Sequence, residues 1–188
     1  MTLHHFIGAD KELAIGEYGR NPTLKPISEL KIKGIDVNKR SQVKKNRKNS
    51  ENSLVKVYDT EEDAYGIDIV HLDPGYEAVR NKFTHPYIYE LQGYLHANNT
   101  PDQRKSIKSL FLFIEKHLSK GESIEIYSCL DGYEDEDKGE SMDVVINLNT
   151  LQFGKHIKFK DIHHLSHIFY LEDKQYVLVK KQMRKKPI

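Results

Sequence analysis

The clearest periodic pattern in the chain predicts an amphipathic helix from about residue 100 to residue 120. Apolar side chains recur there at spacings of three and four residues, which places them on one stripe of a helix. Thr100 suits the N-cap, Pro101 the first helical position and Gly121 a left-handed stop beyond the end. We therefore expect one long helix, whose stripe packs on a sheet and consists of Ile107, Leu110, Phe111, Ile114 and Leu118.

Alternation of apolar and polar positions predicts strands before and after that helix. In residues 123–130, Ile124 and Ile126 share one face, and Glu125 and Tyr127 lie on the other. Other short runs have the alternation, or the β-branched and aromatic content, of strands. These runs are 3–7, 54–58, 67–72, 87–95 and 143–151.

The last third of the chain contains two apolar runs, 168–171 and 176–181, separated by four polar residues. This pattern predicts an antiparallel hairpin. With short helical turns after Thr60 and Asp73, the elements predict an α+β fold: a mostly antiparallel sheet packed by one long amphipathic helix. At 188 residues the chain is expected to form a single domain, residues 1–188.

Composition and charge narrow the functional classes only slightly. The chain has 29 Lys and Arg against 28 Asp and Glu, so a net charge of +1 gives no overall attraction to nucleic acid or anionic lipid. The single cysteine, Cys129, cannot form an intramolecular disulfide and is expected to be buried and inert. Charged residues interrupt every apolar run, so we expect a soluble cytoplasmic protein that does not contact a membrane.

Three segments, residues 3–8, 58–63 and 126–132, resemble a group of small uncharacterised proteins of Gram-positive bacteria. The resemblance extends over most of the chain. It implies a bacterial cytoplasmic protein, and it implies no particular chemistry, because no activity is assigned to that group.

The densest acidic segment connects two predicted strands and contains Asp131, Glu134, Asp135, Glu136, Asp137 and Glu140. It is not an EF-hand, because the sixth position of such a loop would be Glu136 instead of Gly and the twelfth would be Met142 instead of Glu. Three interpretations remain open: a solvated hairpin tip, a weak divalent-cation site, or a docking patch for a protein partner. The docking interpretation makes residues 134–137 candidate binding residues.

Histidines are densest near the C-terminal third. On a helix His163 and His167 would point the same way, at a spacing that can bind zinc. The zinc-protease pattern requires Glu after the first histidine, and His164 stands there instead. The candidate metal ligands are therefore His156, His163 and His167 with Asp131, and ordinary surface histidines are the alternative interpretation.

A basic run falls within residues 38–52, which we expect to form a mobile loop because almost no apolar residue could order them. A disordered basic loop without a binding role is the favoured interpretation, and weak nucleic-acid binding is the alternative. We expect weak or undetectable binding at physiological ionic strength, and any binding at low salt should depend on the densest part of the run. These residues are Lys44, Lys45, Arg47 and Lys48.

The sequence contains no glycine-rich phosphate loop and no GxSxG motif, so no cofactor is expected. Two functional hypotheses follow. The first is a binding or interaction protein without a catalytic motif, and it is favoured because it requires no missing signature. The second is a divalent-metal-dependent hydrolase or nuclease-like enzyme, which requires His156, His163 and His167 to converge in space.

Overall fold

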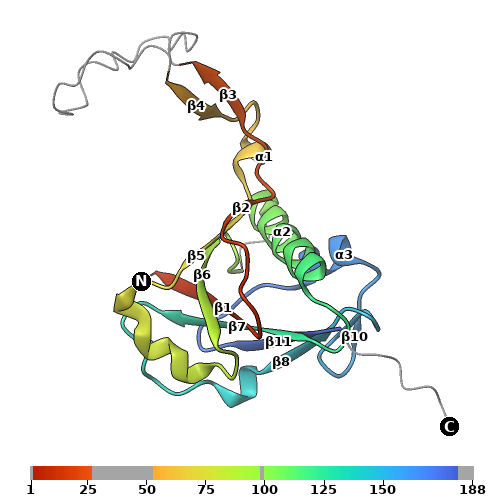
Figure 1. Cartoon of the computed structure of the whole chain (residues 1–188). Helices are drawn as coiled ribbons and strands as arrows, with labels where there is room; N and C mark the ends of the chain where they lie inside the picture. The colour runs from red at the N-terminus through yellow and green to blue at the C-terminus, as the bar shows by residue number, and fades with distance from the viewer. Residues whose placement is uncertain (1, 27–52, 98–99, 182–188) are drawn as a thin grey trace. The chain divides into compact units, whose positions relative to one another are not determined.

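The computed structural model describes residues 2–26, 53–97 and 100–181 (Figure 1). It divides into two compact units, residues 1–20 with 65–188, and residues 21–64. The single-domain organisation stays a prediction, and each unit is described by itself. None of the described helices is long and apolar enough to span a membrane.

The smaller unit pairs strand β3 (Thr23–Pro26) antiparallel with β4 (Leu54–Val57), and helix α1 (Glu61–Ala64) follows. Thr60 and Asp63 each accept a hydrogen bond from the other's backbone N–H, both at 3.2 Å. This reciprocal cap begins the short helical turn that was expected after Thr60.

The larger unit is built on a nine-stranded sheet with the order β10-β9-β8-β11-β7-β1-β6-β5-β2. Its described strands pair antiparallel, except that β8 and β11 are parallel. The sheet is therefore mixed, and the α+β class is as predicted. The strands are β1 (Leu3–Ala9), β2 (Gly16–Tyr18), β5 (Ile67–His71), β6 (Tyr87–Gly93), β7 (Ser123–Leu130), β8 (Val144–Asn147), β9 (Gln152–Phe153), β10 (Ile157–Lys158) and β11 (Tyr176–Lys180).

Helices α2 (Pro101–His117) and α3 (Ile162–Ile168) cover one face of the sheet (Figure 1). The predicted stripe of α2 is buried, and residues such as Phe111 join Ile7 and Ile126 of the sheet in one large apolar cluster. The α2 helix does not cover this face alone, because α3 shares it and contributes the buried Leu165. The helix also ends earlier than predicted: the N–H of its C-cap residue, Leu118, donates to the Ile114 carbonyl at 2.8 Å.

The predicted C-terminal hairpin is wrong. The α3 helix occupies residues up to Ile168, where the first strand of the hairpin was expected to begin, and Leu171 forms an isolated parallel bridge with His96. A helix forms here for two reasons. The Asp161 carboxylate caps its N-terminus by accepting the His164 N–H at 2.7 Å, and Leu165 and Phe169, four residues apart, are both buried.

The opposite face carries the irregular helix η3 (Pro74–Lys82), which begins where the Asp73 carboxylate accepts the Gly75 N–H at 2.7 Å. Beneath it lies a smaller buried cluster. Its fully buried aromatic residues are Phe6 and Tyr127, and its other buried members are Val79, Ile88 and Cys129.

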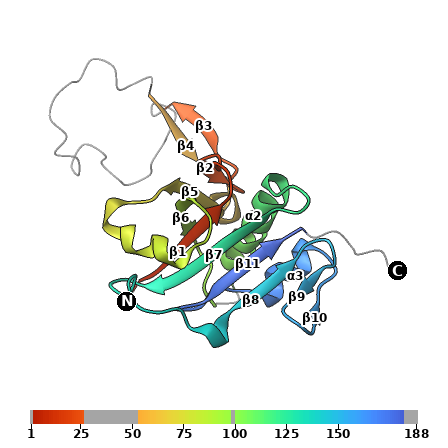
Figure 2. The same ribbon diagram turned by 60° about the horizontal axis from the view of Figure 1, so that its bottom comes forward.

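Residues 131–143, which we call the acidic crossover, connect β7 to β8 and include the short helix η4 (Glu140–Met142). They are not a hairpin tip, because β11 lies between β7 and β8 (Figure 2). The crossover instead meets the residues at the start of β11. There the Gly139 N–H donates to the Lys174 carbonyl at 3.2 Å.

Candidate functional site

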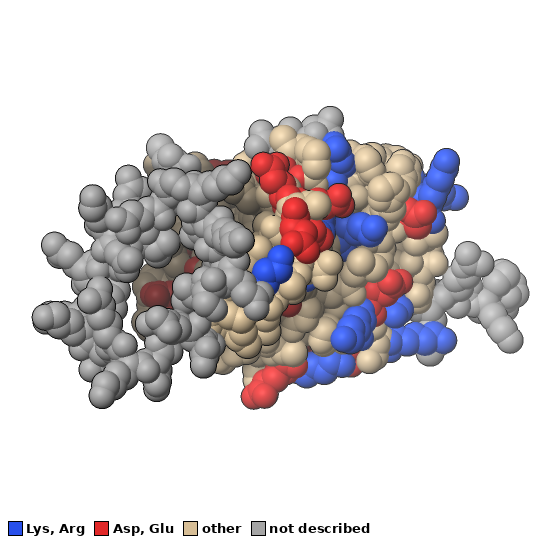
Figure 3. All heavy atoms as spheres, turned by 90° about the horizontal axis from the view of Figure 1, so that it is seen from above, with Lys and Arg blue, Asp and Glu red and all other residues tan. Residues whose placement is uncertain are grey.

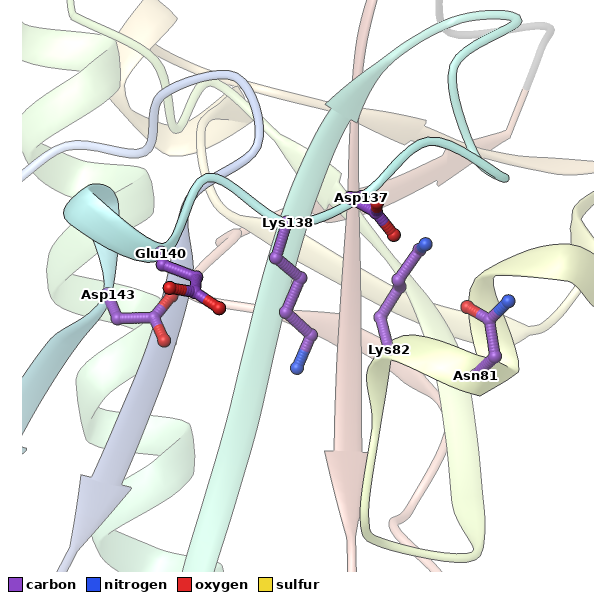
Figure 4. A pocket seen from close by; sticks show the side chains of 6 residues that line it. All are labelled: Asn81, Lys82, Asp137, Lys138, Glu140 and Asp143. Carbon is purple, nitrogen blue, oxygen red and sulfur yellow. The ribbon is translucent and has the colours of Figure 1, made fainter.

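A cavity of about 680 Å³ lies between η3 and the acidic crossover. Two of its lining residues, Asn81 and Lys82, come from the end of η3 (Figure 4). The others come from the crossover and are Asp137, Lys138, Glu140 and Asp143. Figure 4 shows the Lys82 side chain pointing from η3 toward the crossover.

Glu125 of β7 is linked to this cavity through Tyr176, which contacts the cavity residue Lys138, and only 1% of Glu125 is exposed. Its carboxylate accepts hydrogen bonds from the backbone N–H groups of Thr84 (2.9 Å) and His85 (3.1 Å), from the Thr84 hydroxyl and from the Tyr176 hydroxyl (2.6 Å). Burial by itself would raise the pKa of Glu125, but the hydrogen bonds from Thr84 and Tyr176 outweigh it and lower the pKa. Glu125 is therefore a buried carboxylate that stays charged.

The two lysines of the cavity are held in place by neutral groups. The Lys138 ammonium lies 3.7 Å from the centroid of the Tyr176 ring, in a cation–π contact. Lys82 is 6% exposed, and its ammonium donates to the Asp135 carbonyl oxygen at 3.2 Å. Burial lowers the pKa of Lys138, although Asp143 and Glu125 act in the opposite direction. In the described part of the chain, neither lysine forms an ion pair within 4 Å.

The carboxylates of the crossover divide into two groups. Glu136 pairs with Lys174, and Glu134 accepts the Gly132 N–H at 3.0 Å, so both hold the crossover together. The exposed carboxylates of Asp137, Glu140 and Asp143 line the cavity and make no ion pair with any described residue. Of the candidate binding residues 134–137, Asp137 is thus the one that faces the cavity.

The predicted metal ligands are not brought together. His163 and His167 are neighbours on α3, with ring centroids 4.8 Å apart. His156 precedes β10. Asp131 lies elsewhere, with its Oδ1 3.6 Å from Nε2 of His4. Within residues 2–26, 53–97 and 100–181, no group of three or more His, Cys, Asp or Glu side chains could hold a metal ion.

Lys44, Lys45, Arg47 and Lys48 lie outside the described residues, so weak nucleic-acid binding stays a prediction. The face seen in Figure 3 carries acidic and basic side chains interspersed, with no extended region of one sign among its described residues.

A second cavity, of about 270 Å³, lies where β1 begins and β6 ends. It is lined in part by His4, His5 and Glu90. His5 is 5% exposed, and its Nδ1 lies 2.8 Å from the Ser128 hydroxyl oxygen. Burial, with smaller contributions from His96 and His4, lowers the pKa of His5 to about 3, so its ring is neutral at physiological pH.

No motif in the sequence pointed to Glu125, Lys82 or Lys138. The alternation in residues 123–130 placed Glu125 on a polar face, and the structure buries both faces of β7. Comparison with protein-family models, curated proteins and solved structures gives no match to this chain. The function therefore has to be inferred from the geometry of the site.

Proposed function

We propose that this chain is a binding protein whose acidic crossover docks a basic segment of another protein. The observation that supports this proposal is the division of charge in the larger cavity. Asp137, Glu140 and Asp143 have no ion-pair partner among the described residues, whereas Lys138 and Lys82 are held by Tyr176 and by the Asp135 carbonyl. Three exposed carboxylates against two lysines leave the lining with a net charge of −1, so its carboxylates favour a basic ligand.

The crossover is also held in its binding shape before any partner arrives. Lys82 fixes it from η3, and Lys174 fixes it from the residues before β11. A preformed surface loses less conformational entropy on binding than a flexible one does. A lysine or arginine side chain in the cavity would also be partly removed from solvent, where its attraction to carboxylates is screened less than on an open surface.

The metal-dependent hydrolase is the weaker proposal, because its candidate ligands do not converge among the described residues. The docking proposal needs only side chains that the cavity already presents.

A charge-neutralised variant tests the docking surface. The probe is a fluorescein-labelled peptide of alternating lysine and glycine, titrated at low ionic strength and followed by fluorescence anisotropy. The variant Asp137→Asn/Glu140→Gln/Asp143→Asn is expected to weaken binding by about tenfold or more, which corresponds to about 1.4 kcal/mol.

The control variant Glu12→Gln/Glu61→Gln/Glu115→Gln removes the same charge from exposed positions elsewhere. We expect it to weaken binding by less than about twofold, because charges that do not line the cavity act on the peptide through water, whose high dielectric constant weakens the attraction. An equal loss in both variants would show that the peptide responds to net charge alone and would contradict the proposal.

A further inference from the structure

Three side chains with complementary chemistry meet at one end of the sheet. Asp10 directly follows β1, Ser123 is the first residue of β7, and His85 lies shortly before β6. Because β1 runs antiparallel to both neighbours, Ala9 is opposite Ile124 of β7 and Tyr87 of β6. The end of β1 is therefore placed beside the starts of β6 and β7.

The three side chains form a continuous chain of polar contacts. The Asp10 carboxylate lies 2.7 Å from Nδ1 of His85, and Nε2 of His85 lies 3.1 Å from the Ser123 hydroxyl oxygen. An ionised carboxylate only accepts, so the hydrogen of the neutral imidazole belongs on Nδ1. The lone pair on Nε2 then faces Ser123, whose hydroxyl donates to it. This is the arrangement in which histidine serves as the base for a serine nucleophile, and it is recognised by geometry without a sequence motif.

The surrounding structure fixes the histidine from its backbone. Glu125 lies two residues beyond Ser123 on the same face of β7, and its buried carboxylate accepts the N–H groups of Thr84 and His85. The His85 side chain is 9% exposed, so little solvent competes for its two ring contacts. Ser123 itself is only partly buried and is therefore accessible to a reagent.

We propose that Asp10, His85 and Ser123 form a nucleophilic serine site that transfers the acyl group of a small carboxylic ester to water. The Ser123 oxygen attacks the ester carbonyl carbon while Nε2 of His85 takes the hydroxyl proton. Breakage of the ester bond releases the alcohol, which leaves with that proton, and the acyl group stays on Ser123. A water molecule, deprotonated by His85, then attacks the acyl-serine, releases the carboxylic acid and restores the hydroxyl. Asp10 orients Nδ1–H and stabilises the imidazolium formed in each step.

This activity does not depend on the proposed docking surface, because the serine site shares no residue with the cavity lining. The alternative role for the three residues is purely structural, as a tether between the loop before β6 and the adjacent strands. A tether would give Ser123 no reactivity above that of an ordinary serine, so reactivity separates the two.

The test uses the full chain and an alkyl fluorophosphonate carrying a fluorophore, with the modified residue located by peptide mass spectrometry. The parent is expected to take the label at Ser123, and Ser123→Ala is expected to lose it. His85→Gln and Asp10→Asn should each slow labelling by about tenfold or more, because a positioned general base contributes about a hundredfold or more. The exposed Ser141 provides a control, and Ser141→Ala should label like the parent.

Hydrolysis of p-nitrophenyl acetate supplies a second readout, and an acetylated Ser123 should accumulate when the reaction is quenched early. Melting curves of all the variants show whether any of them has lost its fold. The proposal is overturned if the folded parent labels Ser123 no faster than the heat-unfolded chain does. It is equally overturned if folded His85→Gln labels at the parental rate.

Discussion

The two faces of the central sheet are covered by different kinds of side chain. The face under α2 and α3 belongs to one large apolar cluster, which includes Ile7 of the sheet and Leu110 and Phe111 of α2. The face under η3 has a cluster of five buried residues, and beside it lie the charged groups of Glu125 and Lys82, both more than nine-tenths buried. The first face holds the fold together, and the second positions the polar groups to which we assign function.

This division has a physical basis. Burying apolar surface stabilises the folded state without requiring particular partners. Burying a charge is costly unless hydrogen bonds replace the lost water, and Glu125 obtains them from Thr84, His85 and Tyr176. A face built in this way contributes less to stability, but it fixes loops at defined positions.

The largest effect is expected from a cavity in the apolar face. Phe111 is fully buried, and its ring meets Phe169 edge-on at 5.2 Å between centroids. Phe111→Ala should lower the free energy of unfolding by about 3–5 kcal/mol, as measured by urea denaturation. The control is Leu112→Ala on the same helix, where the side chain is 46% exposed and the change should be below about 0.5 kcal/mol. Similar losses in both variants would contradict the assigned orientation of α2.

An intermediate effect is expected on the polar face. Glu125→Gln keeps the shape of the side chain but replaces a buried acceptor with an amide that must also donate. We expect the free energy of unfolding to fall by about 2–3 kcal/mol, because the donor groups of Thr84, His85 and Tyr176 would lose their charged acceptor. Urea denaturation of this variant, compared with exposed Glu12→Gln, measures the difference. Equal stability of the two variants would mean that Glu125 does not anchor this face.

A smaller effect, which depends on pH, is expected from His5, a buried polar residue on the apolar face. Its pKa is about 3 in the folded chain, against an ordinary histidine pKa of 6.5, so between these pH values the unfolded state binds more protons. The contribution of neutral His5 is complete above about pH 6.5 and is lost as the pH falls. At pH 5 the loss amounts to about 2 kcal/mol.

The variant His5→Leu/Ser128→Ala removes the titrating ring together with its polar partner. Unfolding free energies of parent and variant, measured at neutral pH and at pH 5, give the two pH dependences. The variant should lose about 2 kcal/mol less than the parent does on acidification. If acidification lowered the free energy of unfolding equally in parent and variant, other groups would be responsible for the acid sensitivity.

The apolar face was predictable from the sequence because its signals are local. The spacing of residues such as Ile107 and Ile114 identified α2, and the alternation over 123–130 identified β7 with its observed bounds. Strand order was not predictable in the same way. The parallel pairing of β11 with β8 is formed by residues far apart in the sequence, and no turn signal marks it.

The polar face was missed for the same reason. In the sequence, Lys82 resembles an ordinary surface lysine at the end of a short helix. Its burial depends on the acidic crossover, which follows much later in the chain. His85, Asp10 and Ser123 are likewise separate in the sequence, and only the order of β6, β1 and β7 brings them together. The histidines that are dense in the sequence, such as His163 and His167, remain on one helix instead.

Mapping where a basic ligand binds tests the division of the two faces most directly. The uniformly ¹⁵N-labelled chain is titrated with the peptide of alternating lysine and glycine, and amide chemical shifts are recorded. We expect the changes to concentrate in residues 131–143 and at the end of η3 around Lys82, with α2 and α3 unaffected. Changes confined to α2 and α3, or to residues 21–64, would contradict the assignment of binding to the polar face.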